Sequence, residues 1–313
     1  MYSTSLSRRH LLRFLGASAG LAFIPRSLAS NISVIANPKF TYCLNTATIR
    51  GHKLGLMREL ELVSKAGFGS IEIWMDTLTA YLDSGGTLAE VKNRLNNLGL
   101  KIESAIGFAP WIVDDDNVRK KGIELLKREM ELLAALGCKR TAAPPVGATD
   151  KPGLDLDKAT ERYRVILELG EQTGVIPQLE LWGFSANLNR LSELLYVAAQ
   201  SGHPEAKVLL DNYHLYKGGT NINSLKLLNP DGIEVFHVND YPATLTPEKI
   251  TDADRIYPGD GAAPIRQVLT SLQHSARPLV ISFEVFNKNY YSQDPLQVLQ
   301  TSLAKMKKVT EGI

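Results

Sequence analysis

The chain has 313 residues, of which 44% are hydrophobic and 22% charged, and its formal charge is +2 at pH 7. This length can bury a large core, and the near balance of 35 basic and 33 acidic residues removes any argument from charge for a nucleic-acid partner. Two cysteines, Cys43 and Cys138, are too few for a disulfide scaffold or a cysteine-rich zinc module.

Residues 1–29 have the pattern of a targeting signal. Paired arginines, Arg8 and Arg9, precede an apolar Gly/Ala-rich run at 14–24, and Ser27-Leu28-Ala29 places small residues where a signal peptidase cleaves. The run is too short for a stable membrane span. The arginine pair indicates the twin-arginine export machinery and a periplasmic or otherwise exported protein. The alternative is an amphipathic N-terminal helix of a cytosolic protein. Cleavage removes four arginines and no acid, which lowers the formal charge from +2 to −2.

The remainder, residues 30–313, alternates short apolar runs with amphipathic ones. The apolar runs predict strands at Phe40–Leu44, Ser70–Trp74, Lys101–Ile106, Arg140–Ala143, Ile176–Leu181, Val208–Leu210, Ile233–Val238 and Leu279–Val285. The amphipathic runs predict helices at Leu54–Ala66, Thr87–Leu98, Val118–Leu136, Leu156–Thr173, Leu188–Gln200, Ile222–Leu228, Ile265–Gln273 and Pro295–Lys308. Both cysteines lie at expected strands, so two buried thiols are favoured over one disulfide between them.

This alternation predicts an α/β fold, a single-domain (β/α)8 barrel. Several helices end in glycine shortly before a strand, as at Gly99 and Gly174, which suits the left-handed residue that closes a helix. No Pro/Ser/Gly-rich linker divides the domain. An open doubly wound sheet is the competing fold, but no G-x-G-x-x-G follows the first strand, so a dinucleotide site there is not expected.

Four expected strands end in a side chain that can bind a metal. Asp211 and His237 end the sixth and seventh strands, while Glu180 and Glu284 stand in the otherwise apolar ends of the fifth and eighth. Taken singly, Asp211 could be a helix or turn cap and His237 a satisfied buried histidine. A buried, unpaired carboxylate is costly, however, and the C-terminal ends of barrel strands meet at one mouth. The four residues together therefore predict a metal site.

Three carboxylates and one imidazole make a hard, oxygen-rich ligand set. We expect one divalent ion per chain, with Mn²⁺ or Mg²⁺ favoured and Co²⁺ or Zn²⁺ also compatible.

The strand ends resemble those of the xylose isomerase-like barrel superfamily of sugar isomerases and epimerases, which includes ketose 3-epimerases, hydroxypyruvate isomerase and inosose enzymes. The similar stretches are LELW around Glu180, LLDNYH at 209–214, FHVND at 236–240 and RIYPGDG at 255–261. The resemblance implies Glu180, Asp211, His237 and Glu284 as metal ligands, His214 and Arg255 as substrate contacts, and a loop over the site at 258–261. Where ketose epimerases have a further Glu, six residues after the first ligand, this chain has Ala186. Substrate recognition is therefore expected to differ from theirs.

A metal held between two glutamates suits proton transfer next to a carbonyl. The ion can polarise a ketose carbonyl and its neighbouring hydroxyl and stabilise an enediolate. Glu180 and Glu284 are the expected catalytic pair, one removing the proton and the other returning it. Return to the opposite face gives an epimerase, and return to the adjacent carbon gives an isomerase. A leaving group at the β position would make the protein a keto-glycoside lyase or hydratase instead.

Weaker expectations concern residues near the strand ends. Trp74, Phe108 and Trp182 could stack on a sugar, as could Trp111, or could pack at the top of the barrel. Asp240 could orient His237 from behind or cap a loop. Glu72, within the second strand, could face the mouth or pair with an arginine inside the barrel.

Two further function classes are weighed against a sugar enzyme. A metal-dependent endonuclease on a related barrel needs more histidines and a basic groove than this chain offers. A non-catalytic sugar-binding barrel would not require all four ligands. The expected partner is thus a small-molecule sugar, with no nucleic acid and no stable membrane span, and a homo-oligomer is compatible with the sequence.

Overall fold

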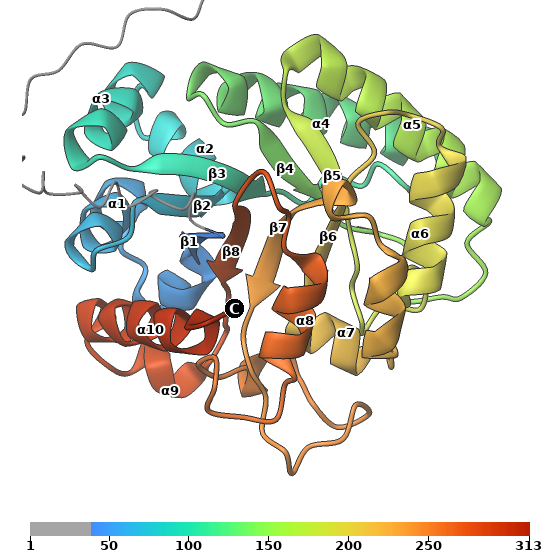
Figure 1. The fold of residues 1–313 in the computed structure, drawn as a ribbon. Helices are drawn as coiled ribbons and strands as arrows, with labels where there is room; N and C mark the ends of the chain where they lie inside the picture. The colour runs from blue at the N-terminus through green and yellow to red at the C-terminus, as the bar shows by residue number, and fades with distance from the viewer. Residues whose placement is uncertain (1–38) are drawn as a thin grey trace, which may run out of the picture. The chain divides into compact units, whose positions relative to one another are not determined.

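The computed structural model describes residues 39–313, and the expected targeting signal lies outside them. These residues form an eight-stranded parallel sheet that curls into a barrel with helices around its outside (Figure 1). The strands, in the order β3-β2-β1-β8-β7-β6-β5-β4, are β1 Phe40–Asn45, β2 Ser70–Trp74, β3 Lys101–Ile106, β4 Arg140–Ala143, β5 Ile176–Glu180, β6 Val208–Asp211, β7 Ile233–Val238 and β8 Leu279–Phe283. The expected (β/α)8 fold is confirmed.

The longer helices lie close to their expected positions. In chain order, the α-helices of the described residues are α1 Leu56–Lys65, α2 Met75–Asp83, α3 Leu88–Leu98, α4 Asp116–Ala135, α5 Leu156–Thr173, α6 Leu191–Gln200, α7 Asn212–Lys217, α8 Ile265–Leu272, α9 Lys288–Tyr291 and α10 Pro295–Thr310. Short 3-10 helices occur at η1 Thr46–His52, η2 Ile222–Leu227, η3 Pro230–Gly232 and η4 Asp252–Asp254. Side-chain caps begin several of the helices: Asp115, for example, accepts hydrogen bonds from the backbone N–H groups of Asn117 and Val118 at the start of α4.

The barrel closes between β3 and β4, which stand at the two ends of the hydrogen-bonded strand order. Arg140 donates from Nη1 to the Glu103 carbonyl at 3.1 Å, and the Thr141 hydroxyl donates to the Ala105 carbonyl at 3.2 Å. Side chains therefore join the two strands, and the sheet becomes a nearly closed barrel.

One helix prediction was wrong in kind. The segment expected to be an α-helix at Ile222–Leu228 is the 3-10 helix η2, and the α-helix after β6 is the six-residue α7. The sequence reading also missed α2 and α9, which follow β2 and β8 closely. α9 has only four residues, too few turns to show an amphipathic repeat. α2 begins at Met75 directly after β2 ends, so no turn residue separates it from the strand.

Most of the core of the described residues lies in two clusters, and a third, small one joins Tyr213, Tyr241 and Ile250. The smaller of the two main clusters, containing Cys43, Leu209 and Val235, fills the barrel interior, while the larger one, containing Cys138, lies between the strands and the helices. Both cysteines are buried and free, as predicted. In residues 39–313 no helix combines the length and the apolar character needed to cross a membrane.

Candidate metal centre and active-site cavity

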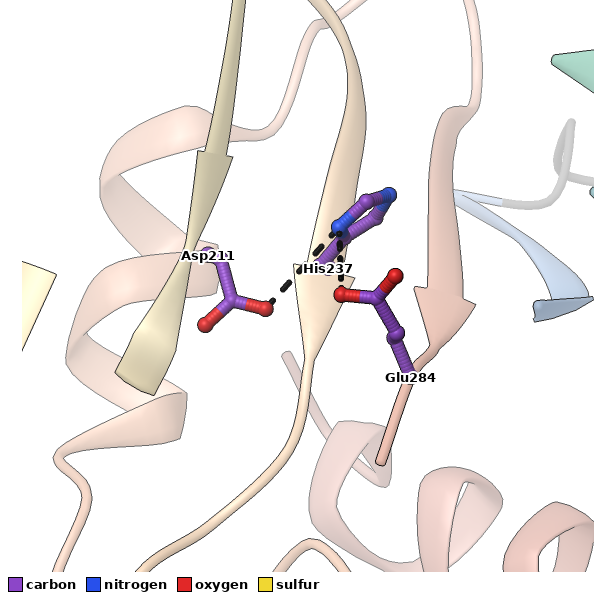
Figure 2. A group of neighbouring side chains, drawn as sticks. All are labelled: Asp211, His237 and Glu284. Atoms are coloured by element: carbon purple, nitrogen blue, oxygen red, sulfur yellow. Dashed lines mark ion pairs between the residues drawn. The ribbon is translucent and has the colours of Figure 1, made fainter. Parts of the chain in front are cut away.

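Asp211, His237 and Glu284 meet at the C-terminal mouth of the barrel (Figure 2). One potential ligand atom from each lies within 4.8 Å of the other two, and all three residues are buried. His237 Nδ1 is 3.2 Å from Glu284 Oε2 and 3.9 Å from Asp211 Oδ2. Strand register produces this convergence: Asp211 is paired with His237 and His237 with Ser282, and Glu284 lies two residues beyond Ser282, on the same face of the chain.

Glu180, the fourth expected ligand, ends β5 and lines the same cavity, but it lies outside the group of three. Its Oε2 has no hydrogen-bond partner among residues 39–313. Burial is the main reason why the pKa of Glu180 is raised to about 8. The charge of His237 lowers this pKa, and the charge of Glu284 raises it. The structure therefore places three predicted ligands together and the fourth beside them, with a free carboxylate oxygen.

Glu72 lies on the opposite side of the His237 ring. Its Oε2 is 2.9 Å from His237 Nε2 and accepts hydrogen bonds from Asn45 Nδ2 at 2.9 Å and from the Ser282 hydroxyl at 2.8 Å. The contact with His237 is an ion pair by distance, although the ring nitrogen is not aligned for a hydrogen bond. Burial lowers the pKa of His237, but Glu72 and Glu284 outweigh this effect and raise it well above its ordinary value. Glu72 was expected either to face the mouth of the barrel or to pair with an arginine inside it. The structure shows that its side chain faces the site.

Arg255 reaches the same carboxylates from the loop after β7. Its Nη1 donates to Glu284 Oε2 at 2.7 Å and to Asp211 Oδ2 at 3.2 Å, and its Nη2 contacts Asp252. Burial opposes its charge, but Asp211, Asp252 and Glu284 together raise the pKa of Arg255 above its ordinary value. Burial alone would raise the pKa of Glu284. The charge and hydrogen bond of His237 and, less strongly, the charge of Arg255 outweigh burial and lower this pKa to about 2.

His214 is a neutral neighbour of Arg255. Its Nδ1 accepts a hydrogen bond from the Gly183 N–H at 3.2 Å, and its Nε2 is 3.2 Å from Arg255 Nη2. Burial and the nearby guanidinium hold the pKa of His214 well below its ordinary value. The two expected substrate contacts, His214 and Arg255, thus stand side by side in the cavity lining.

Asp240 holds a loop instead of orienting His237. Its carboxylate accepts backbone hydrogen bonds from Gly259, Gly261 and Ala263 at 2.8–3.0 Å, as well as from Tyr241. A side chain at position 261 would lie 2.2 Å from the Tyr241 carbonyl oxygen, so a glycine is needed there. Of the two alternatives for Asp240, loop capping is the one observed, and Glu72 provides the contact with His237.

Two asparagines were missed by the sequence reading. Asn45 donates from Nδ2 to Glu284 Oε1 at 3.0 Å as well as to Glu72, and Asn239 donates to Asp211 Oδ2 at 2.8 Å. These amides fix the directions of the carboxylates. Their signal is a polar residue ending or following a barrel strand, a pattern that asparagines in ordinary turns share.

The site opens into a cavity of about 390 Å³. It is lined by Trp74, Ile106, Phe108, Glu180, Trp182, Phe184, His214, Asp252, Ala253, Arg255, Glu284, Phe286 and Lys288. The expected aromatic residues Trp74, Phe108 and Trp182 are among these, whereas Trp111 is buried in the core and donates to the Pro144 carbonyl. A larger hollow of about 550 Å³, lined in part by Asp114 and Lys151, shares none of these residues.

The residues present fit a divalent ion. Carboxylates and an imidazole are suitable donors, and Glu180 supplies a buried oxygen that has no hydrogen-bond partner in the described part of the chain. Because Nε2 of His237 is turned to Glu72, its Nδ1 faces Asp211 and Glu284, the arrangement seen for metal-binding histidines that are backed by a carboxylate.

Comparisons with known proteins agree with this architecture. Inosose isomerase of Bacillus velezensis is 27% identical over 279 residues, which cover 87% of this chain and 96% of that protein. 3-Dehydroshikimate dehydratase of Pseudomonas putida is 21% identical over 242 residues, 75% of this chain and 36% of that protein. The crystal structure of the IOLI protein with a zinc atom has a TM-score of 0.78 and 25% identity, covering 86% of this chain and 97% of that one. A family model described as xylose isomerase-like TIM barrel matches residues 60–309. The chain belongs to this family.

Proposed function

We propose that the protein is a divalent-metal-dependent isomerase or epimerase that moves a proton next to the carbonyl of a sugar or keto-sugar. The observation that carries this proposal is the meeting of Asp211, His237 and Glu284 within 4.8 Å, with Glu284 and Glu180 both lining one cavity. The similarity to inosose isomerase supports the isomerase class, and the zinc atom of the IOLI structure supports the metal.

Asp211, His237 and Glu284 would hold the ion, with Glu180 as the fourth ligand. When bound, the ion supplies Lewis-acid polarisation of the substrate carbonyl and its neighbouring hydroxyl. The oxygen-rich donor set favours Mn²⁺ or Mg²⁺, and Co²⁺ or Zn²⁺ is compatible with it.

Glu180 and Glu284 are the proposed proton carriers. They come from β5 and from the end of β8, so their carboxylates approach the cavity from different strands. One takes the proton from the carbon next to the carbonyl, and the other returns a proton. His214 and Arg255 are the proposed substrate contacts in the same cavity, and Nε of Arg255 has no hydrogen-bond partner among residues 39–313.

The destination of the returned proton decides the product. Delivery to the opposite face of the same carbon gives an epimer, and delivery to the adjacent carbon exchanges the positions of carbonyl and hydroxyl. The similarity to 3-dehydroshikimate dehydratase favours elimination as the second candidate, since loss of a β leaving group follows the same proton abstraction.

We also propose that residues 1–29 direct export by the twin-arginine route, on the pattern of Arg8, Arg9 and Ser27-Leu28-Ala29. An exported enzyme meets glycosides and keto-glycosides outside the cytoplasm, and this is a reason to include them in substrate tests.

The test is a screen in D₂O followed by NMR. Metal-loaded protein is incubated with inosose, with free ketoses and with 3-keto-glycosides. The proposal predicts that deuterium enters next to the carbonyl of at least one class and that chelation of the metal stops it. Metal-independent exchange, or none in any class, would reject the proposal, and release of a leaving group would identify the elimination.

A further inference from the structure

A continuous arc of ring side chains lines most of the cavity mouth. Its members, in order around the barrel, are Phe286, Trp74, Phe108, Trp182, Phe184 and His214. Neighbouring ring centroids are 5.1 to 6.2 Å apart, within the range of favourable aromatic contacts. The arc thus runs from the end of β8 past β2, β3 and β5 to α7. The remaining sector, after β7, carries Asp252 and Arg255.

Two of these rings face solvent. Phe108 is 40% exposed and Phe184 is 45% exposed, although both line the cavity. The residues on either side of each are buried, so the backbone that presents the two rings is packed in place. At Gly183 a side chain would lie 2.2 Å from the His214 carbonyl oxygen, which fixes the approach to Phe184. Exposed aromatic rings whose positions are fixed by a packed backbone indicate a binding surface for an apolar group.

Four polar residues of the cavity lie deeper than these rings. Glu180, His214, Arg255 and Glu284 are all at most 4% exposed. One arginine and one lysine line the cavity, and the arginine, Arg255, is already engaged by three carboxylates. Besides the exposed Lys288, the mouth offers mainly ring faces, and one lysine is little positive charge for binding a phosphorylated substrate there.

We infer that the arc is an aglycone subsite, and that the substrate class is a glycoside or keto-glycoside with an aromatic or otherwise planar apolar aglycone. The sugar ring faces Glu180 and Glu284 at the base, and the aglycone stacks between Phe108 and Phe184 at the mouth. The sugar half of this inference rests on the proposed function, and the aglycone half rests on the arc.

The test compares two probes by isothermal titration calorimetry with the metal-loaded protein. Phenyl β-D-glucoside should bind about tenfold more tightly than methyl β-D-glucoside, the ratio expected for stacking of one ring. Phe108→Ala with Phe184→Ala should bring this ratio close to one. Phe184→Trp, which keeps an aromatic face, should retain the preference. Tyr196→Ala removes a 40% exposed ring on α6 outside the cavity and serves as the matched control.

Equal affinity for the two glucosides, or binding of neither, would overturn the inference. So would a phenyl preference that survives in the Phe108/Phe184 double variant. The proposed function is judged separately, by deuterium exchange. If deuterium enters free ketoses but the phenyl glucoside binds no more tightly than the methyl glucoside, only the aglycone subsite is rejected. If the phenyl glucoside binds more tightly but deuterium enters no sugar, only the proposed reaction is rejected.

Discussion

His237 and Glu72 form an ion pair in the barrel interior, with His237 Nε2 2.9 Å from Glu72 Oε2 and neither side chain exposed to solvent. Because Nε2 is turned toward Glu72, Nδ1 faces Asp211 and Glu284. Asn45 and Ser282 donate to the same oxygen of Glu72 and hold it in position. We therefore propose that Glu72 orients the His237 ring for the proposed metal.

Glu72→Gln should weaken metal binding about 10- to 100-fold, the usual cost of removing a carboxylate that orients a metal-binding imidazole. The measurement is a competition titration against a chelator of known affinity. Asp260→Asn, which neutralises a carboxylate paired with the exposed Lys305, is the control and should keep wild-type affinity. Wild-type affinity in Glu72→Gln as well would mean that Glu72 does not act on the ligand.

The metal content itself should be about one divalent ion per chain after reconstitution. Asp211→Ala combined with His237→Ala removes two of the three grouped ligands and should abolish it. Elemental analysis of the purified proteins checks this. Full occupancy in the double variant would place the ion elsewhere in the chain.

The buried carboxyl group of Glu59 should make the stability of the fold depend on pH. Its side chain is 4% exposed, one of its oxygens has no partner within residues 39–313, and burial raises its pKa to about 7 despite the nearby Arg50. The folded protein thus holds this proton more tightly than the unfolded chain. The resulting stability is fully present below about pH 4.5 and is lost as the pH rises through 7.

Glu59→Gln, which cannot ionise, should therefore gain up to about 3 kcal/mol relative to wild type between pH 5 and pH 8. Urea unfolding at the two pH values measures the difference. Glu61→Gln, on the same helix but paired with Arg58 at the surface, should show a far smaller change. A pH-independent difference for Glu59→Gln would contradict the raised pKa.

Export is tested by Arg8→Lys with Arg9→Lys. The double variant should stay inside the cell as an uncleaved precursor, because the twin-arginine machinery reads this pair. Immunoblots of cell fractions show both whether the protein has been cleaved and in which compartment it lies. Normal processing would point to a general secretory signal.

Much of the barrel could be predicted because its strands are short apolar runs bounded by turns. Ser70–Trp74, Lys101–Ile106 and Ile233–Val238 have the predicted bounds. α7 and η2 could not be predicted in the same way. Each is only six residues long, so contacts with the barrel, and not an amphipathic repeat, decide its conformation.

The candidate ligands could be proposed from the sequence for the same reason, as polar residues ending apolar runs, and Asp211, His237 and Glu284 lie together in the structure. Their partners could not be proposed in this way. Arg255 contacts Asp211 from 44 positions away, and Ser282 reaches Glu72 across 210, so only the closed barrel brings them together. The free oxygen of Glu180 is likewise a property of the packed site, since sequence alone cannot show which buried carboxylates find donors.

The proposed reaction depends on Glu180 and Glu284 as separate proton carriers, and deuterium exchange by their glutamine variants tests this most directly. Glu180→Gln and Glu284→Gln keep the side-chain shape and one oxygen that could bind the metal. In each variant, the fraction of bound metal should therefore fall less than the turnover rate. Turnover on the substrate identified in the D₂O screen should fall at least about 10²–10⁴-fold in each. One variant should still exchange the proton of the substrate, and the other only that of the product. Near wild-type turnover in either metal-bound variant would contradict the two-glutamate reaction.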